Sequence, residues 1–171
     1  FTLLTLGETC GVFLADNLYT AFIFFELMSM TSYVWVAHDE KPAALRAAET
    51  YMAVAVISGM VTLMGLFMLY NKIGTLEFVG IRSLISAGRV KPSELRLIAA
   101  LIAVGFAAKA GVFPLHIWLP KAHPVAPAPA SALLSGILTK TGLFGILVIA
   151  ANMLPADAIW GNAMLIFGVI T

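Results

Sequence analysis

LIAALIAVGFAAKAGVFP, residues 97–114, places a lysine, Lys109, inside an apolar helix and follows it with Pro114. A second lysine, Lys140, lies inside the next apolar stretch. An ionisable side chain at membrane depth costs roughly 2.5–3.5 kcal/mol, so it is rare unless it pairs, contacts water or has a function. The two lysines make a proton or ion path the leading hypothesis.

The composition indicates the class of protein. The chain is 61% hydrophobic and 11% charged, with a mean hydropathy of +0.98, whereas soluble domains carry about 25% charged residues. The formal net charge of +1 argues against nucleic-acid binding, which requires a concentrated basic surface. We therefore expect a membrane protein in a lipid bilayer, with no nucleic-acid partner.

Hydropathy predicts the transmembrane segments, each of which requires roughly 20 apolar residues. Asn71–Lys91 reads as a polar connector, and Phe1–Leu14 and the stretch after Asp157 read as partial spans. We predict an all-α polytopic membrane protein with about four complete transmembrane helices and two partial ones. Residues 1–171 form a single transmembrane domain, interpreted as a fragment of a longer protein. The complete spans are Leu18–Ala37, Thr50–Tyr70, Leu95–Leu119 and a segment from Pro127 or Pro129 to about Asn152.

The third complete span contains two prolines, Pro114 and Pro120. Each removes a backbone donor and clashes with the preceding turn, so we predict a helix break near Gly111 to Leu115. Irregular backbone survives in a membrane only where protein buries it or it lines a watery cavity, and transporters bind ions at such broken helices. A plain proline kink used for packing is the alternative.

Glu26, near the middle of the Leu18–Ala37 span, is the candidate counter-charge for Lys109. Opposite charges within about 4–6 Å hold each other ionised, so Glu26 is expected to control how tightly Lys109 holds a proton. A static ion pair, or a protonated glutamate hydrogen-bonded to a neighbouring helix, remains open as an alternative.

Lys140 has no carboxylate within its own span. It is expected to be buried and to alternate between protonated and neutral forms, with snorkelling to the membrane surface as the alternative. The same helix carries hydroxyl residues at four-residue spacing, which predicts a polar stripe for helix packing or for a water path. These residues are Ser131, Ser135 and Thr139.

Two histidines follow Lys109, and both are candidates for a proton relay because histidine titrates near neutral pH. His116 would share a face with Lys109 if the helix persisted through Pro114. His123 is a relay candidate whose alternative is an interfacial hydrogen bond. Two histidines without clustered carboxylates are a poor ligand set, so we expect no metal site.

Three segments resemble a known family. They are FELMSMTSY at residues 25–33, GFAAKAGVFPLHIWLPKAH at residues 105–123 and APAPASALLSGILTKTG at residues 126–142. They resemble the antiporter-like membrane subunits shared by respiratory complex I, multi-subunit sodium/proton antiporters and membrane-bound hydrogenases. The resemblance covers nearly the whole chain, and the block with the two lysines is its most specific part.

The resemblance implies a subunit of about fourteen helices in two inverted five-helix repeats, of which this chain is similar to the first. It implies that Glu26 is the glutamate of the fifth helix, Lys109 the lysine of the broken seventh and Lys140 the lysine of the eighth. His116 and His123 match histidines that family members often carry. These residues would form a switchable ion pair with a central proton carrier, in a subunit that works with other membrane subunits.

The expected function is proton translocation in a redox-driven complex of the complex I or hydrogenase type, located in the cell membrane rather than an organelle membrane. The alternative is a subunit of a multi-subunit sodium/proton antiporter, and a structural subunit with inactive charges is a third possibility. No Gly-rich phosphate loop, cysteine cluster or nucleophile triad occurs. We therefore expect no cofactor and no catalytic site in this chain, with any electron transfer in partner subunits.

Overall fold

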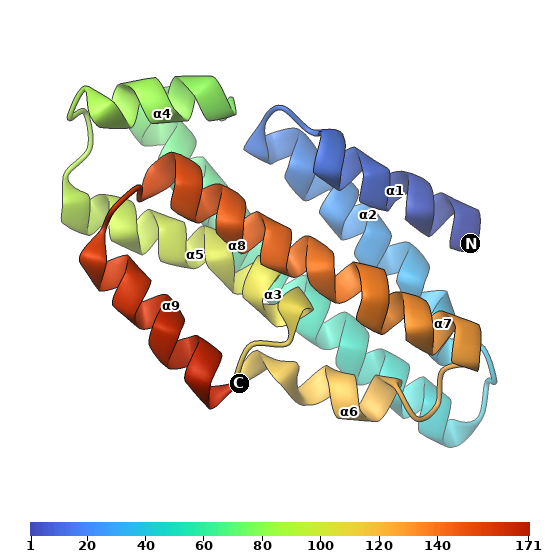
Figure 1. Ribbon diagram of the computed structural model, residues 1–171. Helices are drawn as coiled ribbons and strands as arrows, with labels where there is room; N and C mark the ends of the chain where they lie inside the picture. The colour runs from blue at the N-terminus through green and yellow to red at the C-terminus, as the bar shows by residue number, and fades with distance from the viewer.

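The computed structural model describes residues 1–171 and is helical throughout, with a single isolated β-bridge between Asn17 and Glu77. Figure 1 shows α8 lying over α5, with the neighbouring helices α1 and α2 on one side of this pair and α9 on the other. The α-helices are α1 (Thr2–Leu14), α2 (Leu18–Ala37), α3 (Pro42–Ile73), α4 (Phe78–Ser86), α5 (Pro92–Ala110), α6 (Leu119–Ala122), α7 (Ala128–Leu133), α8 (Thr139–Met153) and α9 (Ala158–Ile170). A 3₁₀ turn, η1 (Leu115–Trp118), precedes α6, and a π-helical turn, η2 (Leu134–Leu138), joins α7 to α8.

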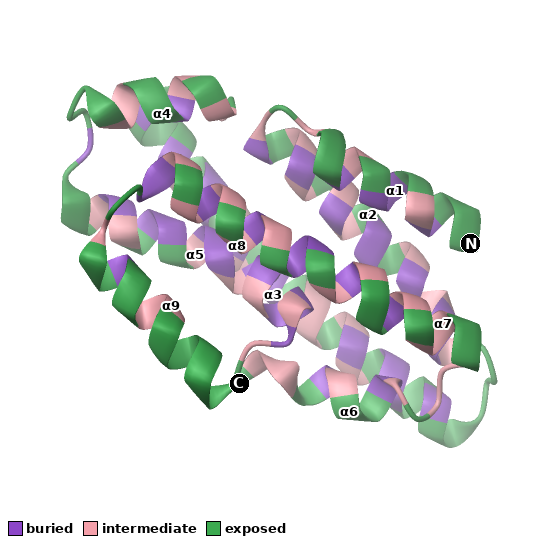
Figure 2. Ribbon diagram, in the orientation of Figure 1, coloured by how far each residue is buried: buried purple, intermediate pink, exposed green.

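Four helical segments are long and apolar enough to cross a membrane, which confirms the all-α polytopic fold class. They are Leu18–Ala37, Pro42–Ile73, Pro92–Ala122 and Ala128–Met153. Figure 2 shows exposed residues along the outer faces of these helices and buried residues where the helices meet. Many of the exposed side chains are large and apolar, as on α3, where Ile57, Met60 and Phe67 face outward.

Two boundaries in the sequence-based prediction were wrong. The helix predicted from Thr50 begins at Pro42, since proline suits the first helical position and the alanines that follow are strong helix formers. The predicted polar connector Asn71–Lys91 contains α4, because Phe78 and Ile81 share a face that packs toward the core. Hydropathy detects apolar spans, and it misses both a polar helix start and a short surface helix.

The predicted break in the third span is confirmed. Helix α5 ends at Ala110, where Gly111 adopts a left-handed conformation with φ 82° and its N–H bonds to the last carbonyls of the helix. Glycine favours this conformation because it has no Cβ. A cis peptide bond joins Phe113 to Pro114, and the chain then continues as η1 and α6. The break therefore leaves Lys109 in the last turn of α5.

Helix α5 is the centre of the bundle, between α3 and α8. Thr62 of α3 links two points of the α5 backbone, accepting from the N–H of Gly105 at 3.0 Å and donating to the carbonyl of Ile102 at 3.2 Å. On the other side, Gly142 of α8 sits directly against the backbone of Phe106 and Ala110, where any side chain would collide. Small residues of this kind let membrane helices approach closely.

Candidate functional site

Lys109 is buried at the end of α5, with 4% of the residue exposed. Its Nζ donates a hydrogen bond to the Tyr51 hydroxyl of α3 at 2.8 Å. The same Nζ lies 4.7 Å from the centroid of the Tyr51 ring and 5.5 Å from that of Phe25 in α2. An ammonium group at such distances is attracted to the face of an aromatic ring. Two aromatic rings and one hydroxyl therefore surround the amine, with side chains from three helices.

The Tyr51 hydroxyl extends this contact into a hydrogen-bonded chain. Its oxygen lies 2.6 Å from the Ser32 hydroxyl of α2, and Ser32 Oγ donates to the Met28 carbonyl at 2.6 Å. The chain is satisfied when Lys109 donates to Tyr51, Tyr51 to Ser32 and Ser32 to the backbone. Trp118 of η1 packs on the Tyr51 ring at 4.9 Å and donates to the Ala108 carbonyl at 2.8 Å, so the segment beyond the break also supports the site.

Tyr51 and Ser32 were not predicted from the sequence. A buried tyrosine needs a hydrogen-bond partner, but the chain holds four tyrosines, and no spacing distinguishes Tyr51 from the others. The relation between Tyr51 and Lys109 joins residues far apart in the chain. Only the packing of α3 against α5 reveals it.

Glu26 lies close to this site without pairing to Lys109. Its half-buried side chain rests against Gly59 of α3. A Cβ added at Gly59 would lie only 2.5 Å from Glu26 Oε1. Glu26 Oε1 is buried and has no hydrogen-bond partner. The structure contains three ion pairs, and none involves Glu26 or Lys109. Glu26 thus contacts α3 at Gly59, eight residues along the helix from Tyr51, and does not form an ion pair with Lys109.

A small cavity adjoins Lys109, with about 10 Å³ of room for a water molecule, which is about enough for one. Its polar lining consists of Lys109, Tyr51 and the hydroxyls of Ser29 and Ser58. Ser58 immediately precedes Gly59, against which Glu26 packs. The cavity therefore adjoins the amine, and one of its lining residues is next in sequence to the α3 residue that Glu26 contacts.

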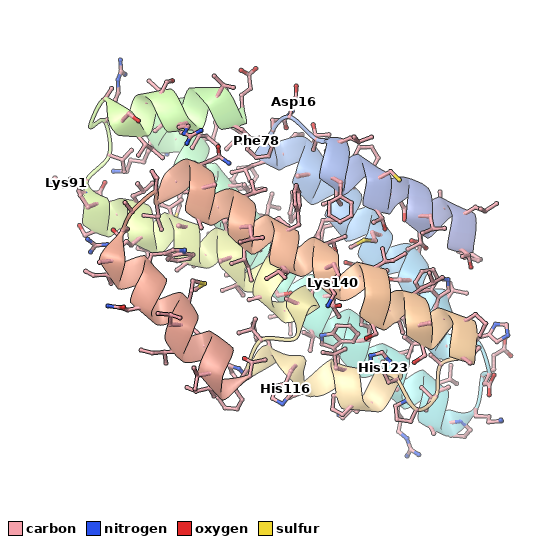
Figure 3. The ribbon with its side chains drawn as sticks, in the orientation of Figure 1. Asp16, Phe78, Lys91, His116, His123 and Lys140 are labelled. Carbon is pink, nitrogen blue, oxygen red and sulfur yellow. The ribbon has the colours of Figure 1, made fainter.

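Lys140 differs from the prediction. It lies inside the helical segment Ala128–Met153, as expected, but its side chain is exposed in residues 1–171 and makes no hydrogen bond or ion pair. The cause is the way α8 packs on α5, because Gly142 forms the contact with α5. Lys140 is two positions before Gly142, so it projects about 200° away from that contact around the helix. Figure 3 shows the lysine beside the middle of the α7–α8 segment.

The two histidines lie at opposite ends of the η1–α6 segment (Figure 3). His116 was expected to share a helix face with Lys109 only if the helix continued through Pro114. Because α5 ends at Ala110, before Gly111, the two residues do not share a face. His116 Nδ1 is buried without a hydrogen-bond partner, and its ring lies 5.6 Å from that of Phe113. His123 Nδ1 lies 2.8 Å from the Ser131 hydroxyl at the start of α7. Neither histidine is hydrogen-bonded to Lys109 or Lys140.

The polar stripe is divided by the π-helical turn η2. Ser131 joins His123, whereas Ser135 is exposed and Thr139 donates to the Ser135 carbonyl at 2.7 Å. No three His, Cys, Asp or Glu side chains gather as a metal-ligand set in residues 1–171. What the arrangement offers chemically is a buried amine, a nearby carboxylate, hydroxyl groups and room for water.

Similar proteins occur in several membrane complexes. The chain is 31% identical to hydrogenase-4 component B of Escherichia coli (strain K12) over 169 residues, which are 97% of this chain and 25% of that protein. It is 32% identical to a Na(+)/H(+) antiporter subunit of Alkalihalophilus pseudofirmus over 148 residues, which are 86% of this chain and 30% of that protein. The chain thus spans less than a third of these two relatives.

Solved structures share the fold. A chain of the membrane-bound sulfane sulfur reductase, an archaeal respiratory membrane complex, superposes with a TM-score of 0.85 at 26% identity, over 96% of this chain and 33% of that one. A chain of the Mrp complex from Dietzia sp. DQ12-45-1b superposes with a TM-score of 0.86 at 24% identity. The match covers 96% of this chain and 31% of that one. The model of the NADH:quinone oxidoreductase/Mrp antiporter transmembrane family matches residues 15–171, and the chain accordingly belongs to this family.

Proposed function

We propose that the chain is the proton-translocating part of a longer membrane subunit, of about fourteen helices, in a redox-driven complex of the complex I or hydrogenase type. The proposal rests mainly on Lys109, a buried amine at the end of a broken helix that is held by a tyrosine hydroxyl and by no carboxylate. The cell membrane is its proposed location, and other membrane subunits are its proposed partners. Hydrogenase-4 component B, to which the chain is similar, supports this branch.

The proposed switch is electrostatic. A rotation of the Glu26 side chain away from Gly59, toward the cavity lined by Ser58, would bring the carboxylate toward Lys109. Opposite charges at close range stabilise each other's ionised forms, so Lys109 holds its proton while Glu26 is near and releases it when Glu26 withdraws. The unpartnered Glu26 Oε1 supports this, because no hydrogen bond fixes that oxygen in its present position.

The remaining residues have proposed places along the path. The Tyr51 hydroxyl keeps the amine oriented toward the cavity while Glu26 is away. Lys140 then accepts the released proton and passes it onward, a role that requires its amine to change protonation. His123 with Ser131 is proposed to exchange protons with the aqueous phase at the α6–α7 end, and His116 is a second relay candidate.

The test is proton uptake by membrane vesicles that contain the full-length subunit in its complex. We expect Glu26→Gln to lose most proton translocation while the complex still assembles, because the amide keeps the shape of the side chain and cannot hold Lys109 charged. Glu49→Gln, an exposed glutamate of α3, is the matched control and should translocate normally. Normal translocation by Glu26→Gln would disprove the switch.

A second candidate function is that of a sodium/proton antiporter subunit, favoured by the similarity to the Na(+)/H(+) antiporter protein of Alkalihalophilus pseudofirmus. The same vesicles distinguish the two functions. Proton movement that starts when Na⁺ is added, without any redox substrate, supports the antiporter. Proton movement that requires an electron donor, together with copurifying iron–sulfur or flavin subunits, supports the redox-driven complex.

A further inference from the structure

Glu8 is a second carboxyl group at membrane depth, outside the site described above. It lies in the middle of α1, within LLTLGETCGVFL at residues 3–14, and 6% of the residue is exposed. The sequence-based prediction treated this segment only as a partial span, although Glu8, like Glu26, is a charged residue within an apolar run. A buried carboxyl inside an apolar helix requires a physical explanation, because ionisable groups are costly in this environment.

Glu8 is held by hydroxyl groups at the contact between α1 and α2. Thr31 of α2 donates a hydrogen bond to Glu8 Oε2, and Thr5 of α1 lies 2.9 Å from the Thr31 hydroxyl as a further donor. Thr5 is completely buried. Glu8 Oε1 makes no hydrogen bond, so Thr31 is the only group that donates to this carboxyl.

No positive charge within residues 1–171 pairs with Glu8. Helices α2 and α8 pack against α1, and the titratable groups within them are Tyr19, Glu26, Tyr33 and Lys140. None of these groups forms an ion pair or a hydrogen bond with Glu8. A hydroxyl partner serves either protonation state of a carboxyl, because it can donate to the carboxylate and accept from the acid.

The hydroxyl cluster and the Lys109 network share one acceptor, the Met28 carbonyl, from which Thr31 Oγ1 lies at 3.3 Å and to which Ser32 Oγ donates at 2.6 Å. A carbonyl has no proton to pass on. Met28 lies between them, completely buried, and its sulfur accepts from Thr9 of α1 at 3.4 Å and from Thr141 of α8 at 3.8 Å. A thioether has no proton to donate, so it ends a chain of proton-carrying groups. Glu8 therefore belongs to a separate site.

We propose that Glu8, with Thr31 and Thr5, forms a second proton-binding site at the α1–α2 contact. A metal ion fits poorly, because only three side chains supply oxygen there and hard cations such as Ca²⁺ and Mg²⁺ take about six or more oxygen ligands. The site binds a proton whichever of the two proposed functions the longer protein performs, since it does not depend on Glu26 or Lys109.

The test is labelling with dicyclohexylcarbodiimide of the full-length subunit in its native membranes. The O–H of a protonated carboxyl adds across a C=N bond of this reagent, and the adduct rearranges to a stable N-acylurea that peptide mass spectrometry detects. We expect labelling of Glu8 to be several-fold higher than that of Glu94, a surface carboxylate paired with Lys72 at 3.0 Å. Glu8→Gln should lose the label at this position.

A threonine variant tests the hydroxyl partner. Thr31→Val should increase the labelling of Glu8, because the carboxylate loses its only donor, and Thr31→Ser should restore the wild-type labelling. Infrared spectroscopy gives a second measurement: a protonated carboxyl band that is present in the wild type and absent in Glu8→Gln. The proposal is wrong if Glu8 shows neither label nor band, or if Na⁺ but not K⁺ protects it from the reagent.

Discussion

The two lysines at membrane depth look alike in sequence and differ in structure. Lys109 is buried, hydrogen-bonded to Tyr51 and flanked by two aromatic rings, whereas Lys140 is exposed and has no partner. Each lies well inside a predicted span, so depth along a helix does not determine a side chain's surroundings. What separates them is which face of the helix packs: Lys109 points toward α3, and Lys140 points away from the contact of α8 with α5.

The largest effect is expected for Lys109→Ala. It removes the buried amine on which Glu26 is proposed to act, and a positioned proton-transfer group contributes roughly 100-fold or more to a rate. Proton uptake by vesicles at matched expression should fall to near the background. Assembly should survive, because the Tyr51 hydroxyl still has Ser32 as a partner. Translocation above about half the wild-type rate would contradict the role of Lys109.

The next largest effect is expected for Lys140→Arg. Arginine keeps the positive charge and cannot release its proton, since its pKa lies above about 12. If Lys140 carries protons, this variant is nearly as defective as Lys140→Ala in the same vesicle assay. The exposed position leaves room for the larger side chain, so assembly should be normal. Near wild-type rates in the arginine variant would mean that Lys140 supplies only a fixed charge.

Tyr51→Phe should have a smaller effect, confined to the Lys109 side of the comparison. It keeps the ring against Trp118 and removes the hydroxyl that accepts from Lys109. A hydrogen bond within a protein contributes about 0.5–1.5 kcal/mol, so we expect a lower thermal stability and a several-fold lower rate of proton uptake. Tyr33→Phe is the control, because the Tyr33 hydroxyl makes no hydrogen bond in residues 1–171. Equal effects of the two variants would exclude a specific role for Tyr51.

The smallest effect on transport is expected for Asp157→Asn, far from both lysines. Asp157 caps α9, and the hydrogen bond from Arg96 of α5, followed by that from the Trp160 N–H, holds its pKa below the usual value. Because the pKa of Asp157 is lowered in the folded state, its carboxylate stabilises the fold at any pH above the unfolded-state pKa, about 3.9. This stabilisation is lost as the pH falls through the folded-state pKa.

At neutral pH, Asp157→Asn should therefore weaken the attachment of α9 to α5. Hydrogen exchange of the α9 amides should become faster, with proton uptake nearly unchanged. In the wild type, the same amides should lose protection when the pH falls below the folded-state pKa. A large loss of transport would show that the α5–α9 contact affects the lysines after all.

Much of the fold was predictable from the sequence. The apolar runs predicted the four spans, and Pro114 predicted the break because proline acts on its own neighbours in the chain. The start of α3 at Pro42 and the short helix α4 were missed, because polar and short helices carry little hydropathy signal.

The candidate site was predictable only in part. Glu26, Lys109 and Lys140 stand out because they are charged residues inside apolar spans. Tyr51, the partner of Lys109, and Thr31, the partner of Glu8, do not stand out, since hydroxyl residues are common in such helices and their contacts join different helices. The exposure of Lys140 depends on the α5–α8 contact, which no local pattern determines.

The most direct test of the central claim is a double-mutant cycle of proton translocation with Glu26→Gln, Lys109→Ala and the double variant, in vesicles at matched expression. If Glu26 acts through Lys109, the two residues form one unit and their effects are not additive. We predict that the double variant translocates protons no more slowly than Lys109→Ala alone. A double variant whose loss equals the product of the two single losses would show that Glu26 and Lys109 act independently, and would contradict the switch.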